Sequence, residues 1–524
     1  MLLADVAATS AALTATRSRL AKRALLVDLL RRAAPAEIPV VARYLAGELR
    51  QRRTGLGWRS LASLPGPAAE PTLEVLAVDA TFEELAALAG PGSAGERSAL
   101  AGRLFAVATA PEQRLLRGLV TGDLRQGALD ALLLDAVAEA AGVPVAAVRR
   151  AAMLAGASEP VAEAALAAPS PEEALAALGA FTLTVGRPVR PMLAASAPDV
   201  AAALEQLPAG AVVVDVKLDG IRIQVHRDGD DVRVFTRSLD DITARVPEIV
   251  AVVRAFPMRA AVLDGEALAL SPDGRPLPFQ ETAARSATHD AELAASTELR
   301  PFFFDLLHLD GRDLMDTPLA ERLAALDTVA TGYVVERVVT GEPGAAQEAF
   351  ARWVAGGQEG AVVKDPAAPY EAGRRGGAWV KVKPRHTLDL VVLAVERGSG
   401  RRQGALSNIH LGARDPAGGF VMLGKTFKGM TDEMLAWQTE RFRELEVADD
   451  GWTVTLRPEQ VVEVAFDGVQ RSPRYPGGVT LRFARVVRYR DDKPAAEADT
   501  IDAVRALLGP PPSPVGPEPA TRPG

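Results

Sequence analysis

The sequence comprises 524 residues, 48% of them hydrophobic and 24% charged, which is an ordinary globular composition and predicts about three to four domains. Its formal net charge of −8 excludes a surface that is basic throughout, as found on many nucleic-acid-binding proteins. The absence of cysteine excludes disulfides, thiolate metal ligands and cysteine nucleophiles.

The N-terminal third is rich in Ala, Leu and Arg at helical spacing, and prolines divide it into short segments. We predict an all-helical domain over residues 1–183, in which Ser170 caps a short helix that has Pro171 in its first turn. The apolar stretch 1–27 is interrupted by basic residues, so it does not resemble a signal peptide, and no later segment is long and apolar enough to span a membrane. A cytoplasmic protein is therefore expected.

Two loops in this region combine glycine with arginine. They cover residues 52–59, which include Arg53, and residues 122–127, which include Arg125 and Gln126. Glycine and arginine ahead of a helix offer backbone N–H groups and a cation to a phosphate. Plain connecting loops have the same composition, so both interpretations stay open here.

Residues 184–198 form a proline-rich bridge. Closely spaced prolines favour extended chain between domains, and the residue pattern changes after this bridge. Alternating β-branched segments follow, separated by Gly and Asp turns. We predict an α+β domain with antiparallel sheets over 184–386 and a small β-barrel over 387–508. The Pro-rich end, 509–524, has the composition of a disordered tail.

The stretch 215–222 reads Asp-Val-Lys-Leu-Asp-Gly-Ile-Arg. The flanking alternation predicts that Lys217 ends one strand and Arg222 begins the next, with Gly220 allowing a tight turn in which a positive φ costs nothing. A lysine in such a turn is a candidate nucleophile when neighbouring cations or burial lower its pKa. A hairpin turn with solvated charges has the same pattern, so this stretch alone does not decide.

Further charged residues interrupt apolar strands downstream, namely Glu266, Glu359, Lys381 and Lys383. Lys381 and Lys383 are two residues apart, so their side chains share one face of a strand. Because burying unpaired charges is expensive, we expect these residues to line one pocket that holds a polyphosphate.

Basic residues are also concentrated in two stretches, with five Lys or Arg in 373–385 and seven in 471–493, which predicts basic patches on an acidic protein.

Taken in order, these motifs resemble those of the ATP-dependent DNA ligases, in particular the archaeal-like bacterial type with three domains. Lys217-x-Asp-Gly-x-Arg222 is similar to the family's nucleotidyltransferase motif. The other matching motifs are Phe-Thr-Arg237, Leu-Asp-Gly-Glu266, Phe-Phe304-Asp-Leu-Leu, Glu359-Gly-x-Val-Val-Lys364, Trp-x-Lys381-x-Lys383 and the basic strand from Arg482 to Lys493. The resemblance implies a helical DNA-binding domain, an adenylation domain and a C-terminal OB-fold barrel. Two residues depart from the pattern: Asp215 stands where many members have glutamate, and Ala484 where proline is common.

The resemblance also implies a mechanism. Lys217 would attack the α-phosphorus of ATP with Lys381 and Lys383 assisting, AMP would pass to the 5′-phosphate of a nick, and the 3′-OH would displace it. The implied nucleotide contacts are Asp215, Arg222, Arg237, Glu266, Phe304 (stacked on adenine), Lys364, Arg375, Lys381 and Arg485; Arg485, Arg488 and Lys493 would orient the pyrophosphate. Glu266 and Glu359 would hold Mg²⁺. The implied DNA contacts are Arg53, Arg125, Gln126, Arg237, Lys425 and Lys428. The expected partner is nicked double-stranded DNA bound by a monomer near the nucleoid, and recruitment by a sliding clamp or repair factors stays open.

Other classes remain to be weighed. An RNA ligase or capping enzyme shares the lysine motif but leaves the long helical region unexplained. An NAD-dependent ligase carries a cysteine zinc site, which this chain cannot form. A non-catalytic DNA clamp derived from a ligase would be expected to lose Lys217, Glu359 or Lys381 first, and all three are present.

Overall fold

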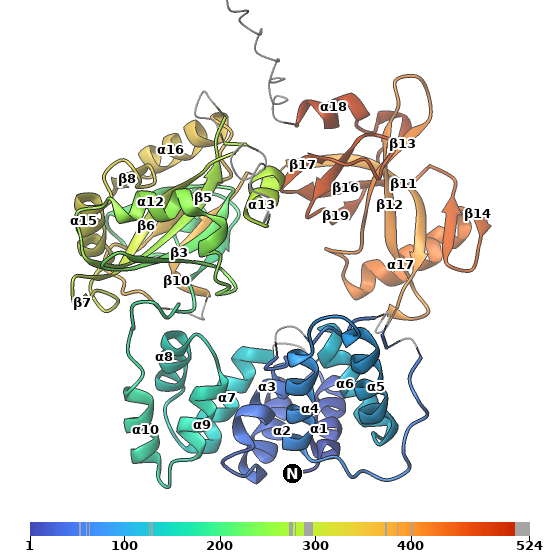
Figure 1. The fold of residues 1–524 in the computed structure, drawn as a ribbon. Coiled ribbons are helices and arrows are strands. Elements are labelled where there is room, and N and C mark those ends of the chain that lie inside the picture. Colours follow the sequence, from blue (N-terminus) through green and yellow to red (C-terminus); the bar gives the residue numbers. More distant parts are fainter. Residues whose placement is uncertain are drawn as a thin grey trace, which may run out of the picture.

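The computed structural model describes residues 1–51, 54–58, 60–61, 63–124, 126, 129–271, 276–277, 279–287, 297–371, 375–384, 386–399 and 402–508. The chain forms three lobes that follow one another in sequence (Figure 1). The helical lobe lies across the base, with a middle lobe and a C-terminal lobe above it. The predicted disordered tail, residues 509–524, falls outside the described residues.

The helical lobe packs around one apolar core that includes the fully buried Leu29, Val41 and Phe82. Its helices are α1 (Leu3–Ala15), α2 (Arg19–Arg32), α3 (Ile38–Leu45), α4 (Val75–Ala87), α5 (Ser93–Ala106), α6 (Ala110–Thr121), α7 (Leu129–Ala141), α8 (Val145–Ala155), α9 (Glu159–Leu166) and α10 (Pro171–Gly179). The predicted cap is confirmed, because the Ser170 side chain accepts a hydrogen bond from the Glu173 backbone N–H and Pro171 is the first residue of α10. A sequence-local signal thus sets the start of α10.

The middle lobe contains two five-stranded sheets. The first runs in the order β1 (Leu193–Ala197), β10 (Arg375–Val382), β9 (Gly360–Lys364), β2 (Val212–Lys217), β8 (Arg337–Thr340). The second runs in the order β4 (Asp231–Thr236), β3 (Ile221–Asp228), β5 (Ala260–Ala269), β6 (Leu299–Leu309), β7 (Arg312–Asp313). The antiparallel prediction holds except for β1 and β10, which pair in parallel.

Separate helices cover each sheet. Helices α11 (Val200–Leu204) and α16 (Pro343–Ala355) share a core with β2, β9 and β10. Helices α12 (Pro247–Arg254) and α15 (Leu319–Val329) share another with β3, β5 and β6. Since β2 belongs to the first sheet and β3 to the second, the turn at 218–220 joins the two sheets, and Lys217 lies at that junction.

The C-terminal lobe contains a seven-stranded sheet with the path β13 (Phe420–Thr426), β12 (Leu406–Arg414), β11 (His386–Arg397), β15 (Thr453–Leu456), β14 (Glu446–Asp449). Strand β16 (Val461–Phe466) also pairs with β11 and with β19 (Arg485–Tyr489), and β17 (Gly468–Arg471) and β18 (Val479–Arg482) form a hairpin. The remaining helices are α17 (Asp432–Glu444) and α18 (Ile501–Ala506).

The predicted C-terminal sheet domain is thus present, but the strand pairings among the described residues do not close it into a barrel. Strand β11 pairs with β16 over its first half and with β15 over its second half, and its pairing with β12 is interrupted by a register shift between Val392 and Ala394. Such an irregularity bends a strand and lets it change partners, so the sheet branches at β11.

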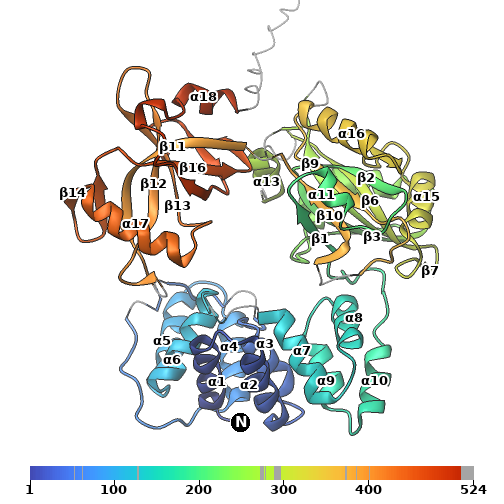
Figure 2. The same cartoon turned by 180° about the vertical axis from the view of Figure 1, so that it is seen from behind.

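Ion pairs and one helix connect the lobes. Arg150 pairs with Asp316 at 2.6 Å and Arg190 with Asp130 at 2.7 Å, which joins the helical lobe to the middle lobe. Helix α13 (Phe279–Ala287) lies between the middle and C-terminal lobes in both views (Figures 1 and 2). Across the described ranges, no helix combines the length and apolar character needed to cross a membrane.

Candidate active site

The site is built around the turn that follows β2. A Cβ atom added to Gly220 would lie 2.4 Å from the Ala267 carbonyl oxygen and 2.9 Å from the Glu266 side chain. Gly220 is not among the positive-φ residues, so the prediction that its φ matters is wrong; the position needs glycine because strand β5 passes too close. This close approach brings Glu266 against the turn that carries Lys217.

Glu359 lies between two of the predicted lysines. Its carboxylate forms ion pairs with both Lys217 and Lys383, and its backbone N–H donates to the Lys217 carbonyl at 3.0 Å. The next residue, Gly360, has φ +147°, and a Cβ there would lie 2.1 Å from the Val382 carbonyl oxygen. The glycine therefore lets β9 begin directly beside β10 and holds Glu359 between the two strand ends.

Lys383 forms ion pairs with residues of both the middle and the C-terminal lobe. Its ammonium pairs with Glu359 and, at 3.3 Å, with Asp467 in the loop before β17. Burial opposes the charged form, but Glu359 and Asp467 outweigh it and raise the pKa of Lys383. Lys381 lies two residues earlier on β10, half-buried and opposite Val362 of β9.

Glu266 is the second carboxylate beside Lys217. Burial raises the pKa of Glu266 to about 7, against the opposing pull of Lys217 and Arg222, and Glu359 raises it further. The described residues contain no cluster of three or more His, Asp or Glu arranged for a metal. Glu266 and Glu359 together still supply the one or two carboxylates with which proteins commonly hold a phosphate-bound Mg²⁺.

Arg222 is half-buried and held in a fixed position. Its guanidinium pairs with Asp264 through two hydrogen bonds of 3.0 and 2.7 Å and donates to the Met192 carbonyl at 2.7 Å. The Tyr370 hydroxyl donates to the same Asp264 carboxylate at 2.7 Å. Asp264 and Tyr370 were not predicted, although Asp264 precedes Glu266 in an otherwise apolar strand.

Three residues predicted to contact the nucleotide also come together. Lys364 is buried, pairs with Asp215 at 2.5 Å and donates to the Phe304 carbonyl at 3.2 Å. Its ammonium lies 4.9 Å from the Phe304 ring centre and 4.2 Å from that of Trp379, within cation–π range. Arg337 lies 3.6 Å from the Asp215 carboxylate and was not predicted, because it is an isolated arginine on edge strand β8.

The C-terminal lobe reaches this site through its hairpin. Arg482 pairs with Asp219, two residues after Lys217, at 2.6 Å, and its guanidinium lies 5.3 Å from the ring centre of Phe279 in α13. Asp467 pairs with Arg485 at 3.4 Å as well as with Lys383, so the predicted Arg485 lies beside the site. Asp467 itself was missed because nothing local marks it.

The predicted DNA contacts are more scattered. Arg237 is exposed after β4, Lys425 pairs with Glu396, and Lys428 lies 5.7 Å from the Phe483 ring centre. Gln126 has 2% exposure, which does not fit the predicted surface contact, and its backbone carbonyl accepts a hydrogen bond from Lys22. Arg53 and Arg125 lie outside the described residues, and only the backbone of Arg375 is described, within β10.

Comparison with known proteins identifies the family. Residues 63–138 match the family described as DNA ligase N terminus, 191–383 the ATP dependent DNA ligase domain, and 402–493 the ATP dependent DNA ligase C terminal region. A protein of Beutenbergia cavernae named "Probable DNA ligase" is 73% identical over 97% of this chain and 100% of its own length. A protein of the same name from Nocardioides sp. is 64% identical over 97% of this chain and 99% of its own.

A solved structure titled "Pmar-Lig_PreS3" shares the fold, with a TM-score of 0.60 at 19% identity over 93% of this chain and 99% of that one. The three family matches lie within the helical, middle and C-terminal lobes in turn, and the middle match contains Lys217, Glu266, Glu359 and Lys383. The chain therefore belongs to the ATP-dependent DNA ligase family of enzymes.

Proposed function

We propose that this protein seals nicks in duplex DNA through a covalent adenylate on Lys217. The observation that carries the proposal is the position of Lys217, which lies at the junction of two sheets, paired with Glu359 and beside Glu266. A lysine among charged, partly buried groups at a strand end is suited to act as a nucleophile.

In the first step the Lys217 nitrogen attacks the α-phosphorus of ATP. An N–P bond forms, the bond to pyrophosphate breaks, and Lys217 loses a proton. Arg222, Lys381 and Lys383 stabilise the phosphate oxygens. Glu359, which pairs with both Lys217 and Lys383, has to release at least one of them when the phosphates arrive.

The nucleoside has its own group of residues. Phe304 stacks on adenine, and Asp215 and Lys364 lie next to that ring. Because Asp215 is already paired with Lys364, its carboxylate is fixed in place for a contact with the base. Arg222 and Glu266 contact the ribose or its surroundings, and Arg375 and Arg485 complete the predicted nucleotide contacts.

Glu266 and Glu359 are the residues that would hold Mg²⁺. Their carboxylate oxygens are the ligand type that this ion prefers. Glu359 pairs with Lys217, and Glu266 lies against the turn that carries Lys217. When bound, the ion neutralises phosphate charge and polarises the reacting phosphorus.

AMP then moves to the 5′-phosphate of the nick, and the 3′-OH displaces it to close the strand. Arg237, Lys425, Lys428, Arg53 and Arg125 are the proposed phosphate contacts, while Gln126 would have to leave its buried position to reach DNA. Such contacts are independent of base sequence and weaken with salt. Arg485, Arg488 and Lys493 orient the leaving pyrophosphate in the first step.

Domain limits of 1–183, 184–386 and 387–508 belong to the same proposal. So do a monomeric state, a location at the nucleoid in the cytoplasm, and recruitment by a sliding clamp or repair factors. The location follows from the proposed substrate, because chromosomal nicks are found at the nucleoid.

The proposal is tested by sealing assays on matched substrates. Purified protein, Mg²⁺ and ATP are incubated with a nicked DNA duplex, a nicked RNA duplex or a triphosphate-ended RNA. We expect joining of the DNA nick with ATP and none when NAD replaces ATP. Joining confined to RNA, or transfer of a nucleotide to the RNA end, would overturn the DNA-nick assignment.

A further inference from the structure

Asp389 in the C-terminal lobe forms ion pairs with two basic residues that follow β19, Arg490 and Lys493. The Asp389 Oδ2 atom accepts a hydrogen bond from Arg490 Nη1 at 3.0 Å and another from Lys493 Nζ at 2.8 Å. The Asp389 side chain is only 14% exposed, and those of Arg490 and Lys493 are 20% and 22% exposed. These are therefore partly desolvated pairs, which hold their geometry better than exposed ones.

The backbone fixes Asp389 independently of its side chain. Asp389 lies near the start of β11, six residues after Lys383, and so next to the connection between the middle and C-terminal lobes. Its backbone N–H donates to Asp499 Oδ2 at 2.8 Å, and the Asp499 N–H donates to its carbonyl at 2.8 Å. A substitution of the carboxylate alone leaves these links in place.

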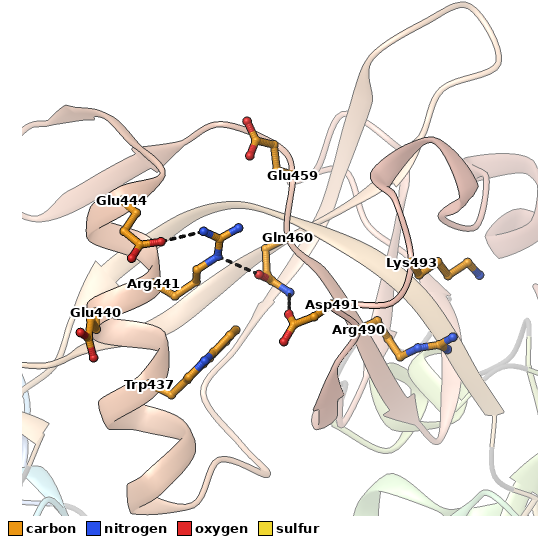
Figure 3. Close-up of a pocket in the computed structure, with 9 residues that line it drawn as sticks. All are labelled: Trp437, Glu440, Arg441, Glu444, Glu459, Gln460, Arg490, Asp491 and Lys493. Carbon is orange, nitrogen blue, oxygen red and sulfur yellow. Dashed lines mark hydrogen bonds and ion pairs between the residues drawn. The ribbon is translucent and has the colours of Figure 1, made fainter.

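The turn that carries the two cations is also held by its backbone. The Arg490 N–H donates to the Val461 carbonyl at 2.9 Å, and the Lys493 N–H donates to the Arg490 carbonyl at 3.2 Å. Figure 3 shows the Arg490 and Lys493 side chains extending the same way, away from the chain of hydrogen bonds through Arg441, Gln460 and Asp491. Arg490 also donates to Asp492, at 2.9 Å through Nε and 2.8 Å through Nη2, so Asp389 is the carboxylate that joins Lys493 to this pair.

We propose that Asp389 is a positioning residue for the adenylylation of Lys217: it holds Arg490 and Lys493 together as a two-cation clamp for the β- and γ-phosphates of ATP. This inference rests on the proposed function, in which Lys493 orients the pyrophosphate. Without the carboxylate Lys493 loses its ion pair and regains rotamer freedom that nucleotide binding has to remove, and Arg490, still held by Asp492, repels it. The later steps involve no pyrophosphate, so Asp389 affects only the first.

The test compares two reactions of the same full-length variant. For Asp389→Asn we expect the apparent KM for ATP in self-adenylylation to rise about tenfold, the cost of ordering the Lys493 side chain against the repulsion of Arg490. Sealing of a nick that already carries AMP at its 5′-phosphate should stay within about twofold of wild type, since that reaction needs no ATP. Asp449→Asn is the matched control: Asp449 ends β14 of the same lobe and pairs with Arg397 and Arg443, and its substitution should change neither reaction.

A double-mutant cycle separates positioning from a general structural role. If Asp389 acts through Lys493, Asp389→Asn should add little in a Lys493→Gln background. Additive effects, or an equal loss of both reactions in Asp389→Asn, would overturn the inference. If Asp389→Asn does not fold, the double variant Arg490→Gln/Lys493→Gln replaces it. This variant should lose ATP affinity in self-adenylylation and still seal a nick that carries AMP. Unchanged ATP affinity in the double variant would overturn the inference. Wild-type protein that takes no label from ATP would overturn the proposed function itself, whereas labelling unaffected by Lys493→Gln would overturn only the clamp.

Discussion

Arg482 of the C-terminal lobe forms an ion pair with Asp219 of the middle lobe at 2.6 Å, although 263 positions separate them in the sequence. Asp219 lies two residues after Lys217, in the turn that joins the two sheets of the middle lobe. The same hairpin region brings Asp467 to Lys383 at 3.3 Å. The position of the C-terminal lobe is thus coupled directly to the residues around the nucleophile.

Replacing Arg482 with glutamine should loosen this coupling. The pair is partly exposed, so we expect a loss of about 1 kcal/mol, or about fivefold in the population with the lobes in contact. Because the chain has no cysteine, fluorophores can be placed on cysteines introduced at Glu348 of α16 and Glu433 of α17, which are both exposed. Energy transfer between them should fall in Arg482→Gln.

Two further variants check the cause. Arg443→Gln removes an exposed pair with Glu446 in the same lobe and should leave the energy transfer unchanged. Combining Arg482→Asp with Asp219→Arg should restore part of the signal, because the pair is re-formed with its charges exchanged. An Arg482→Gln protein with wild-type energy transfer would show that the ion pair does not hold the lobes together.

Gly220→Ala should block adenylylation while leaving the fold of the lobe in place. The added Cβ would meet the Ala267 carbonyl at 2.4 Å, so the turn has to move and displace Lys217 from Glu266 and Glu359. A displacement of about 1 Å commonly costs about 100-fold in rate, which is the loss we expect in labelling from ATP. Gly344→Ala, at a position in α16 with no neighbour within 4 Å, is the control and should label normally.

His226 predicts a specific pH dependence of stability. Its Nδ1 accepts from the Gly186 N–H at 3.0 Å and its Nε2 contacts Gln224 Oε1 at 2.9 Å, which anchors the bridge between the helical and middle lobes. Burial, reinforced by His308 and Arg233, lowers the pKa of His226 to about 3, against 6.5 in the unfolded chain. The unfolded state therefore binds the proton first, so this contribution is complete above pH 6.5 and is lost as the pH falls towards 3.

At pH 5.5 the loss amounts to about 1.4 kcal/mol of the free energy of unfolding. His226→Gln, which keeps an acceptor but cannot be protonated in this range, should show a correspondingly smaller drop between pH 7.5 and pH 5.5. Urea unfolding of both proteins at the two pH values measures the difference. Identical pH dependence in wild type and variant would mean that His226 is not the residue responsible.

These contacts also show what a sequence can and cannot reveal. Lys217 could be placed at a strand end because apolar alternation on both sides of Gly220 is a local signal. Glu266 and Glu359 could be suspected because a carboxylate inside an apolar strand needs a partner. The partner itself could not be predicted: Asp467 meets Lys383, and Arg337 meets Asp215, only after strands far apart in sequence have paired.

The predictions of the fold show the same difference between local and long-range features. The helical, mixed and sheet-rich regions follow from residue periodicity, and the Ser170 cap follows from local chemistry. The parallel pairing of β1 with β10 and the branching of the sheet at β11 depend on long-range pairing, which composition and spacing do not encode. Gly220 shows a further limit, because its requirement comes from the neighbouring strand and not from its own φ.

The central claim is that Lys217 carries the adenylate that is passed to a nick. It is tested by incubating the protein with ATP labelled at the α-phosphate, denaturing it, and mapping the label, before and after addition of nicked duplex. We predict label on Lys217 that transfers to DNA and is released as AMP on sealing, and no label on Lys217→Ala. Label on Lys217→Ala, or label that stays on the protein when nicked DNA is present, would contradict this account.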